Sequence, residues 1–238
     1  RFNKKDLIPF SISDTDFIIP KPITKKIHEV ADHQIYGYTR WNHHDFKSSI
    51  TTYFKRRFDT DMEEDWILYS PSVMYSVSLL IRLLSQPHDK VLTMNTMYDA
   101  FINVIKENDR ELLSHHLIKE EGTFKIDFDV FEKQAQESTL LLLCSPHNPT
   151  GRIWSDEEMH RMIEICKKYH VKIISDEIHM DIRIKDAKHH PLMKYYGEYK
   201  DIFTASSSSK TLNTPGLIGS YVIIPDEKIR DEFLGVTR

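Results

Sequence analysis

The chain has 238 residues, of which 40% are hydrophobic and 29% charged, a composition typical of a soluble globular protein with a sizeable core. The formal net charge of −4 argues against a strongly basic nucleic-acid-binding surface. No apolar run approaches the roughly 20 residues that a membrane-spanning helix requires. The two cysteines, Cys144 and Cys166, are too few for a disulfide framework, and we expect reduced thiols in a cytoplasmic protein.

Two further exclusions concern metals and targeting. The 13 histidines include three adjacent pairs, at 43–44, 115–116 and 189–190, but no third ligand follows at metal-binding spacing, so we expect no metal site. We expect no secretory or transit segment. It begins with Arg1 rather than Met, and we expect both ends to be cuts in a longer protein.

Along the chain, residues 1–60 are polar with helical patterns, and we predict an N-terminal arm and helical lead-in there. From 61 to 238, strand-like runs alternate with helical patterns, which predicts one large domain. Helices are expected near 72–85, 98–108, 127–136 and 225–234, with another beginning after Ser155. The predicted strands are 66–69, 91–94, 112–117, 139–144, 171–175, 202–205 and 220–224.

The run Leu140-Leu141-Leu142-Leu143-Cys144 is continuously apolar, as in a strand buried on both faces of a parallel sheet. Ser155-Asp156-Glu157-Glu158 has the form of a helix N-cap with an acidic first turn. Strands that alternate with helices indicate right-handed βαβ units. The sequence therefore predicts an α/β fold, a three-layer α/β/α sandwich with a mostly parallel, seven-stranded sheet.

Unusual polar segments follow five of the predicted strands. In parallel sheets, ligands bind outside the carboxyl ends of the strands, so we expect these segments to converge on one edge. They are 70–73, 95–98, 145–151, 176–179 and 206–210.

Lys210 ends one of these segments, after the small-residue run 204–209 and the apolar pair Ile202-Phe203. Burial disfavours the charged form of lysine, and a neutral amine is what a Schiff-base nucleophile needs. By itself the position also fits a surface lysine. The segments Ser145–Arg152 and Ser175–His179 upstream favour the catalytic interpretation.

Together, these segments resemble the fold-type-I pyridoxal-phosphate (PLP) enzymes, the aspartate-aminotransferase superfamily. Their order matches: a serine-containing loop, an aromatic residue, Asn-Pro-x-Gly, an aspartate, then Ser-x-x-Lys. The closer resemblance is to the cystathionine β-lyase (C–S lyase) branch of the MalY/PatB type, and it covers nearly the whole chain. The segments that carry it are 11–17, 36–41, 70–75, 98–101 and 174–181.

The resemblance implies roles for five residues around the PLP ring. Lys210 would bind PLP covalently and shuttle protons, and Asp176 would pair with the pyridine nitrogen. Asn148 would bind the phenolic oxygen, a contact that His179 would share. Tyr98 would stack on the ring and is, with Lys210, a candidate catalytic residue. The alternatives are a helix-capping aspartate, a plain β-turn at Asn148 and core packing of Tyr98.

Five more residues would hold the phosphate. Ser72 and the Val73 backbone N–H open a predicted helix toward it, and Ser207 and Ser209 would add hydroxyl donors. The alternative for the serines is a merely polar turn. Tyr38 resembles the tyrosine that reaches the phosphate from the neighbouring subunit, which implies a homodimer.

Ile218 stands where many aminotransferases have an arginine, eight residues after the lysine, and the C–S lyase branch also lacks that arginine. The family's C-terminal small domain, with its carboxylate-binding arginine, is expected to lie outside this chain. We predict a PLP-dependent C–S β-lyase that cleaves cystathionine or related cysteine S-conjugates to pyruvate, ammonia and a thiol. The alternatives are an amino-acid aminotransferase and a truncated, non-catalytic PLP-binding fragment.

Overall fold

A seven-stranded sheet forms the centre of the computed structural model, which describes residues 12–13, 15–40, 42–183 and 186–237. Its order is β1-β9-β8-β7-β6-β2-β3, and only β9 runs antiparallel to its neighbours. The predicted mostly parallel sheet is therefore confirmed, with all seven predicted strands. They are β1 (Ile67–Ser70), β2 (Lys90–Asn95), β3 (Glu111–His116), β6 (Leu140–Cys144), β7 (Lys172–Asp176), β8 (Ile202–Ser206) and β9 (Ser220–Ile223).

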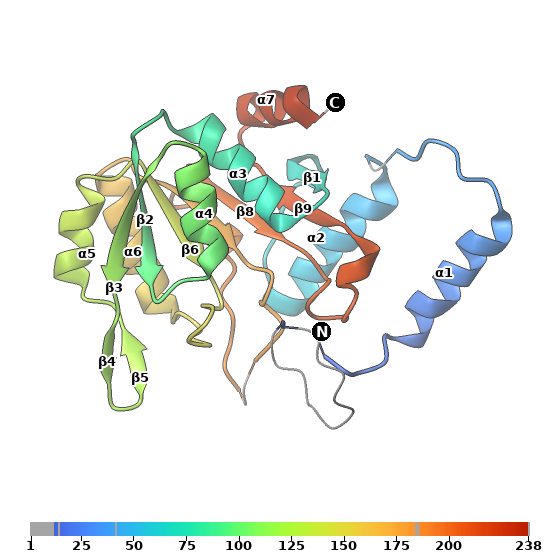
Figure 1. The fold of residues 1–238 in the computed structure, drawn as a ribbon, viewed down its shortest axis with the longest axis horizontal. Helices are drawn as coiled ribbons and strands as arrows, with labels where there is room; N and C mark the ends of the chain where they lie inside the picture. Colours follow the sequence, from blue (N-terminus) through green and yellow to red (C-terminus); the bar gives the residue numbers. More distant parts are fainter. Residues whose placement is uncertain (1–11, 14, 41, 184–185, 238) are drawn as a thin grey trace, which may run out of the picture.

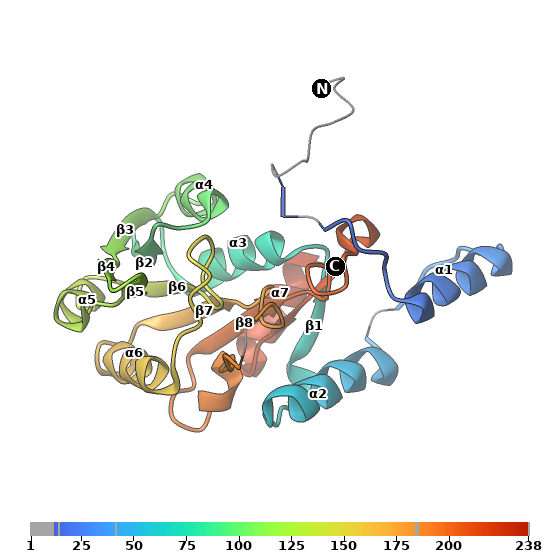
Figure 2. The same ribbon diagram turned by 90° about the horizontal axis from the view of Figure 1, so that it is seen from below.

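Helices cover both faces of this sheet (Figures 1 and 2). Seven α-helices lie in the described part of the chain: α1 (Lys21–His33), α2 (His44–Phe58), α3 (Val73–Leu84), α4 (Asp99–Glu107), α5 (Phe128–Ala135), α6 (Asp156–Lys168) and α7 (Glu227–Thr237). Three short 3₁₀ turns accompany them, η1 (Glu64–Trp66), η2 (Leu192–Tyr195) and η3 (Pro215–Leu217). None of these helices is long and apolar enough to cross a membrane.

The β6 strand shows why the fold has three layers. Its five residues are all buried, and successive side chains point to opposite faces. Leu141 and Leu143 join the hydrophobic cluster formed with α2, α5 and α6. Leu140 and Leu142 join the cluster formed with α3, α4 and α7 on the other face. A continuous apolar run thus supplies both cores, as the sequence predicts.

The start of α6 confirms the predicted N-cap. The Ser155 side chain accepts a hydrogen bond from the Glu158 backbone N–H at 3.1 Å, and the Glu158 carboxylate accepts one from the Ser155 N–H at 2.7 Å. This capping box satisfies two backbone donors that a helix terminus otherwise leaves free. It fixes where the chain turns after the 145–151 segment.

A small hairpin was not predicted. Strands β4 (Ile118–Glu120) and β5 (Thr123–Lys125) pair antiparallel beyond β3. Glu121 and Gly122 connect them, with φ of 49° and 78°. Two successive residues with positive φ are the feature of a type I′ turn, which suits the twist of a hairpin.

The lead-in contains two helices with different environments. Phe54 of α2 is fully buried, and Ile50 is 8% exposed in the same cluster as β1 and β6. In contrast, α1 has no buried residue and lies apart from the sheet in both views (Figures 1 and 2). The α2 helix is thus packed on the core, and the domain division at residue 60 stays a prediction.

Replacing Phe54 with alanine tests the packing of α2. We expect Phe54→Ala to lower the free energy of unfolding by about 3–5 kcal/mol, because it removes a fully buried ring and leaves a cavity. Urea unfolding of the full-length protein measures this. The control Val130→Ala, at a position of α5 that is 41% exposed, should cost less than about 1 kcal/mol. Equal effects of the two substitutions would contradict the packing described for α2.

Candidate active site

The carboxyl ends of five parallel strands meet at one edge of the sheet. Strands β1, β2, β6, β7 and β8 point the same way, because β9 is antiparallel to both β1 and β8. The segments that follow them are therefore neighbours, as expected from the sequence. They carry Ser72, Tyr98, Asn148, His179 and Lys210.

Asp176 is the last residue of β7, which lies between β6 and β8, and its side chain is buried. The residue is 4% exposed, and its Oδ1 accepts a hydrogen bond from the Ile178 N–H at 3.1 Å. Among the described residues, no cationic side chain lies within ion-pair distance of it. Burial raises the pKa of Asp176 to about 7, and the charge of Glu177 adds to the increase.

Lys210 is half-buried in a tight turn after β8. The Leu212 N–H donates to the Ser208 carbonyl at 2.9 Å, and the Thr214 N–H to the Ser209 carbonyl at 2.9 Å. Ser207 stabilises this turn, because its hydroxyl donates to the Gly219 carbonyl at 2.7 Å and accepts from the Ser209 N–H at 3.1 Å. The lysine is thereby presented at the sheet edge by a well-tethered loop.

His179 lies close to the lysine. Burial, and then the positive charge of Lys210, lower the pKa of His179 below its ordinary value. His179 and Asn148 line the same cavity of about 190 Å³, together with Pro146, Gly151 and Ile182 among others. The structure thus brings together three of the predicted ring-binding side chains.

Tyr98 and Ser72 stand at the starts of two helices. Tyr98 is 38% exposed and precedes α4, with its ring edge-on to Phe101. Partial burial raises the pKa of Tyr98, and the negative charges of Asp99 and Asp176 raise it further. Ser72 is the N-cap of α3, and its side chain accepts from the Tyr75 N–H at 3.2 Å.

Val73 follows Ser72 as the first residue of the helix. Its N–H belongs to the first turn, where backbone donors have no intrahelical acceptor and attract anions. The N-terminus of α3 can therefore bind an anionic group at the sheet edge.

An N-terminal segment crosses the Lys210 turn, a contact that sequence reasoning missed. The Lys210 Nζ donates to the Ser13 carbonyl at 3.1 Å. The Asn213 side chain donates to the Thr15 and Phe17 carbonyls, both at 2.8 Å. The motif at 11–17 was the only sequence signal for this segment, and its Ser11 and Asp14, like Trp41 of the 36–41 motif, lie outside the described residues.

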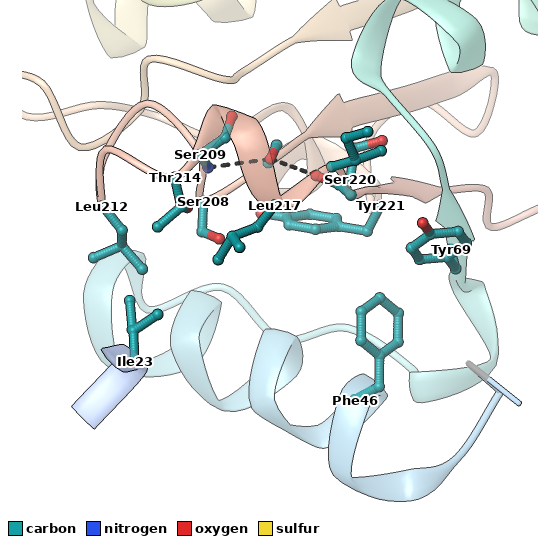
Figure 3. A pocket seen from close by; sticks show the side chains of 13 residues that line it. Ile23, Phe46, Tyr69, Ser208, Ser209, Leu212, Thr214, Leu217, Ser220 and Tyr221 are labelled. Atoms are coloured by element: carbon teal, nitrogen blue, oxygen red, sulfur yellow. Dashed lines mark hydrogen bonds between the residues drawn. The ribbon is translucent and has the colours of Figure 1, made fainter. Parts of the chain in front are cut away.

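A larger cavity of about 390 Å³ lies between α2 and the 207–221 segment (Figure 3). Phe46 and Tyr69 face it from one end and Ile23 and Leu212 from the other, so its walls are mainly apolar. Ile218, which also lines it, is 71% exposed with a φ of 44°, a strained value for a β-branched residue. This cavity adjoins the Lys210 turn but contains neither Asp176 nor His179.

Tyr38 is fully exposed between α1 and α2. The segment that carries it lies away from the carboxyl edge of the sheet in both views (Figures 1 and 2). The chain therefore does not bring Tyr38 to its own site. In the described ranges, no group of three or more His, Cys, Asp or Glu side chains could hold a metal ion.

A doubly covered, mostly parallel sheet that presents a lysine, a buried aspartate and a helix N-terminus at one edge is the large-domain architecture of PLP-dependent transferases. The chain matches the family Aminotransferase class I and II over residues 5–238, and it belongs to that family.

The curated relatives include two bacterial proteins. Cystathionine beta-lyase PatB of Bacillus subtilis is 33% identical over 98% of this chain and 60% of its own length. Protein MalY of Escherichia coli is 35% identical over 100% of this chain and 61% of its own. Among solved structures, the PLP-bound C-S lyase of Staphylococcus hominis has a TM-score of 0.90 and 30% identity, covering 93% of this chain and 57% of that one. The chain thus spans about 60% of the length of these relatives.

The raised pKa of Asp176 makes the stability of the protein pH-dependent. Between about pH 4 and pH 7 the unfolded chain releases this proton while the folded one retains it, so the contribution becomes unfavourable as the pH rises. In full-length protein stripped of bound small molecules, Asp176→Asn should therefore increase stability at pH 8. The gain should be at most roughly 4 kcal/mol and should vanish near pH 4.

Urea unfolding at several pH values measures this difference. The control Asp231→Asn, at an exposed position of α7, should change stability little at any pH. A stability difference between Asp176→Asn and wild type that is constant from pH 4 to pH 8 would contradict the assigned burial effect.

Proposed function

We propose that the full-length protein is a PLP-dependent C–S β-lyase. It would cleave the Cβ–S bond of cystathionine or related cysteine S-conjugates and release pyruvate, ammonia and a thiol. The observation that carries the proposal is that the buried Asp176 carboxyl and the Lys210 turn lie at the same edge of the sheet. Similarity to PatB, MalY and a C-S lyase structure supports the same reaction class.

The residues at this edge fit PLP chemically. Asp176 is a buried carboxyl without a protein cation among the described residues, so a protonated ring nitrogen would supply the missing positive charge. Asn148 and His179, which line one cavity, would bind the phenolic oxygen. Tyr98, held at the start of α4, would cover a face of the ring.

The phosphate would lie at the N-terminus of α3. The Val73 N–H and the Ser72 side chain would bind it there, with Ser209 as a further hydroxyl donor. Ser207 would contribute by holding the turn, because its hydroxyl proton is donated to Gly219. Both serines would therefore contribute to phosphate binding, Ser209 by donating to it and Ser207 by holding the turn in place.

When bound, PLP supplies a protonated ring that accepts electron density from the substrate Cα. Lys210 would hold PLP covalently and, once the substrate amine has replaced it, its Nζ would take the Cα proton. Asp176 would keep the ring nitrogen protonated, because a buried carboxylate stabilises a neighbouring positive charge. Loss of the thiolate from Cβ and addition of water would then complete the conversion to pyruvate and ammonia.

We further propose a cytoplasmic homodimer that shares each site between subunits. Tyr38 is fully exposed in its own chain, and Phe17, Ile18, Ile35 and Tyr36 are also largely exposed. Exposed apolar groups of this kind favour a protein interface. Both cysteines are buried and unpaired, which suits a reducing compartment.

An aminotransferase would use the same residues, and the family to which the chain belongs includes that activity in its name. The two reactions differ in the fate of the proton that Lys210 removes. Transamination returns it to the cofactor and needs a keto-acid acceptor, whereas β-elimination does not. Product analysis therefore separates the two functions.

Full-length protein with PLP and cystathionine should release pyruvate, ammonia and thiol in equal amounts without a keto acid. Lys210→Ala should abolish turnover, because it removes both the covalent link to PLP and the amine that would take the Cα proton. The control Lys200→Ala removes an exposed lysine that stacks on Tyr196 and should leave turnover unchanged. Strict dependence of product formation on an added keto acid would overturn the lyase assignment in favour of the aminotransferase.

The shared site predicts complementation between an impaired subunit and an inactive one. Tyr38→Phe should lower the activity roughly tenfold by removing one charge-assisted hydrogen bond to phosphate. A mixed dimer of Tyr38→Phe and Lys210→Ala subunits has one site with both native residues, so it should recover about half of the wild-type activity. Differently tagged subunits allow the mixed dimer to be purified and assayed. A purified mixed dimer no more active than its parents would rule out the shared site.

A further inference from the structure

The carboxylate of Asp181 joins three segments that are distant in the sequence. Its Oδ1 accepts hydrogen bonds from the Tyr53 hydroxyl and from the Arg57 Nε, the latter at 3.3 Å. Its Oδ2 accepts from the Thr211 hydroxyl at 2.9 Å. Tyr53 and Arg57 belong to α2, and Thr211 directly follows Lys210. We call the contacts of Tyr53, Asp181 and Thr211 the Asp181 bridge.

The bridge is partly shielded from solvent, because its Asp181 end is nearly buried whereas Thr211 is exposed. The Asp181 side chain is 12% exposed, and it lines a cavity of about 290 Å³ whose other walls include Met180, Leu212 and Tyr221. Burial, and then the Asp181 carboxylate, raise the pKa of Tyr53 above its ordinary value, so the phenol remains a donor. Hydrogen bonds to a charged group are stronger than neutral ones, and the low exposure of the Asp181 carboxylate limits its competing contacts with water.

The bridge also connects the two turns that carry the site. Asp181 ends the segment that begins with Asp176, and two backbone hydrogen bonds hold that segment in successive turns. The Met180 N–H donates to the Glu177 carbonyl at 3.0 Å, and the Ile182 N–H to the His179 carbonyl at 2.9 Å. The Thr211 contact therefore fixes the Lys210 turn against the turn of Asp176 and His179.

Ser207 tethers the other end of the Lys210 turn to Gly219. The turn is thus held on both sides of the lysine, on one side by β9 and its lead-in and on the other by Asp181. The Ser206 hydroxyl, just before this turn, also donates to the Glu177 carbonyl at 3.1 Å, and the Asp181 contact adds a link between the Lys210 turn and α2.

We infer that Asp181 is a positioning residue, which holds the Lys210 turn against the Asp176–His179 turn and is itself oriented by α2 through Tyr53 and Arg57. The importance of Asp181 for cofactor binding rests on the proposed function. Its effect on the order of the Lys210 turn is independent of that function. If Asp181 only anchored α2, its substitution would lower the stability of the protein without changing the order of the Lys210 turn.

The test compares four variants of the full-length protein. Asp181→Asn and Thr211→Val break the bridge, and Thr211→Ser keeps its hydroxyl. The control is Asp156→Asn, because Asp156 also accepts from a tyrosine, Tyr195 at 2.5 Å, and from a cation, Lys194 at 2.7 Å. None of these control contacts involves the Lys210 turn.

Two quantities are measured: amide hydrogen exchange of residues 207–212 without PLP, and the Kd for PLP. Loss of a hydrogen bond to a charged group should accelerate the exchange about tenfold and raise the Kd about tenfold for Asp181→Asn and Thr211→Val. Thr211→Ser should behave as wild type in both measurements. Asp156→Asn should lower the Tm but change neither quantity.

Exchange of 207–212 within twofold of wild type in both Asp181→Asn and Thr211→Val would overturn the inference. The inference would also be overturned if the control Asp156→Asn accelerated the exchange of 207–212 as much as Asp181→Asn does. If Asp181→Asn does not fold, the Thr211→Val and Thr211→Ser pair decides: valine replaces the bridging hydroxyl with a methyl group, whereas serine keeps the hydroxyl and lacks only the methyl group of threonine. Failure of the wild type to bind PLP would refute the proposed function, and the exchange measurement would still decide the bridge.

Discussion

The burial of the Asp176 carboxyl at the end of β7 is the constraint on which the site depends. Its position between β6 and β8 removes it from water, and burial raises its pKa to about 7. An ionised carboxylate there destabilises the fold unless a positive charge accompanies it. A ligand with a protonated ring nitrogen would provide that charge, and under the proposed function this would link the stability of the sheet edge to cofactor binding.

The other parts of the site hold reactive groups at a fixed place relative to that carboxyl. Parallel strands bring the segments after β2, β6 and β8 to the same edge. Hydrogen bonds then limit the freedom of the Lys210 turn, through Ser207 at one end and Thr211 at the other. A catalytic amine works best when its geometry is set in advance, so under the proposed function these tethers would serve the chemistry as well as the fold.

Local patterns predicted the fold because each signal lies within one element. The apolar run at Leu140–Cys144 and the N-cap at Ser155 are examples, and the parallel arrangement then located the site edge. The hairpin after β3 was missed because its strands have only three residues each and are mostly exposed. The contacts of Asp181 with Tyr53 and of Lys210 with Ser13 join residues 128 and 197 positions apart, and no local pattern encodes such pairs.

Covalent labelling tests the central claim, that the Asp176 edge presents Lys210 to PLP. The full-length protein is incubated with PLP, reduced with borohydride, digested and mapped by mass spectrometry. A phosphopyridoxyl group on the peptide that contains Lys210, and on no other lysine at comparable yield, is the predicted result. A label found mainly on another lysine, or no label on folded protein, would contradict the account.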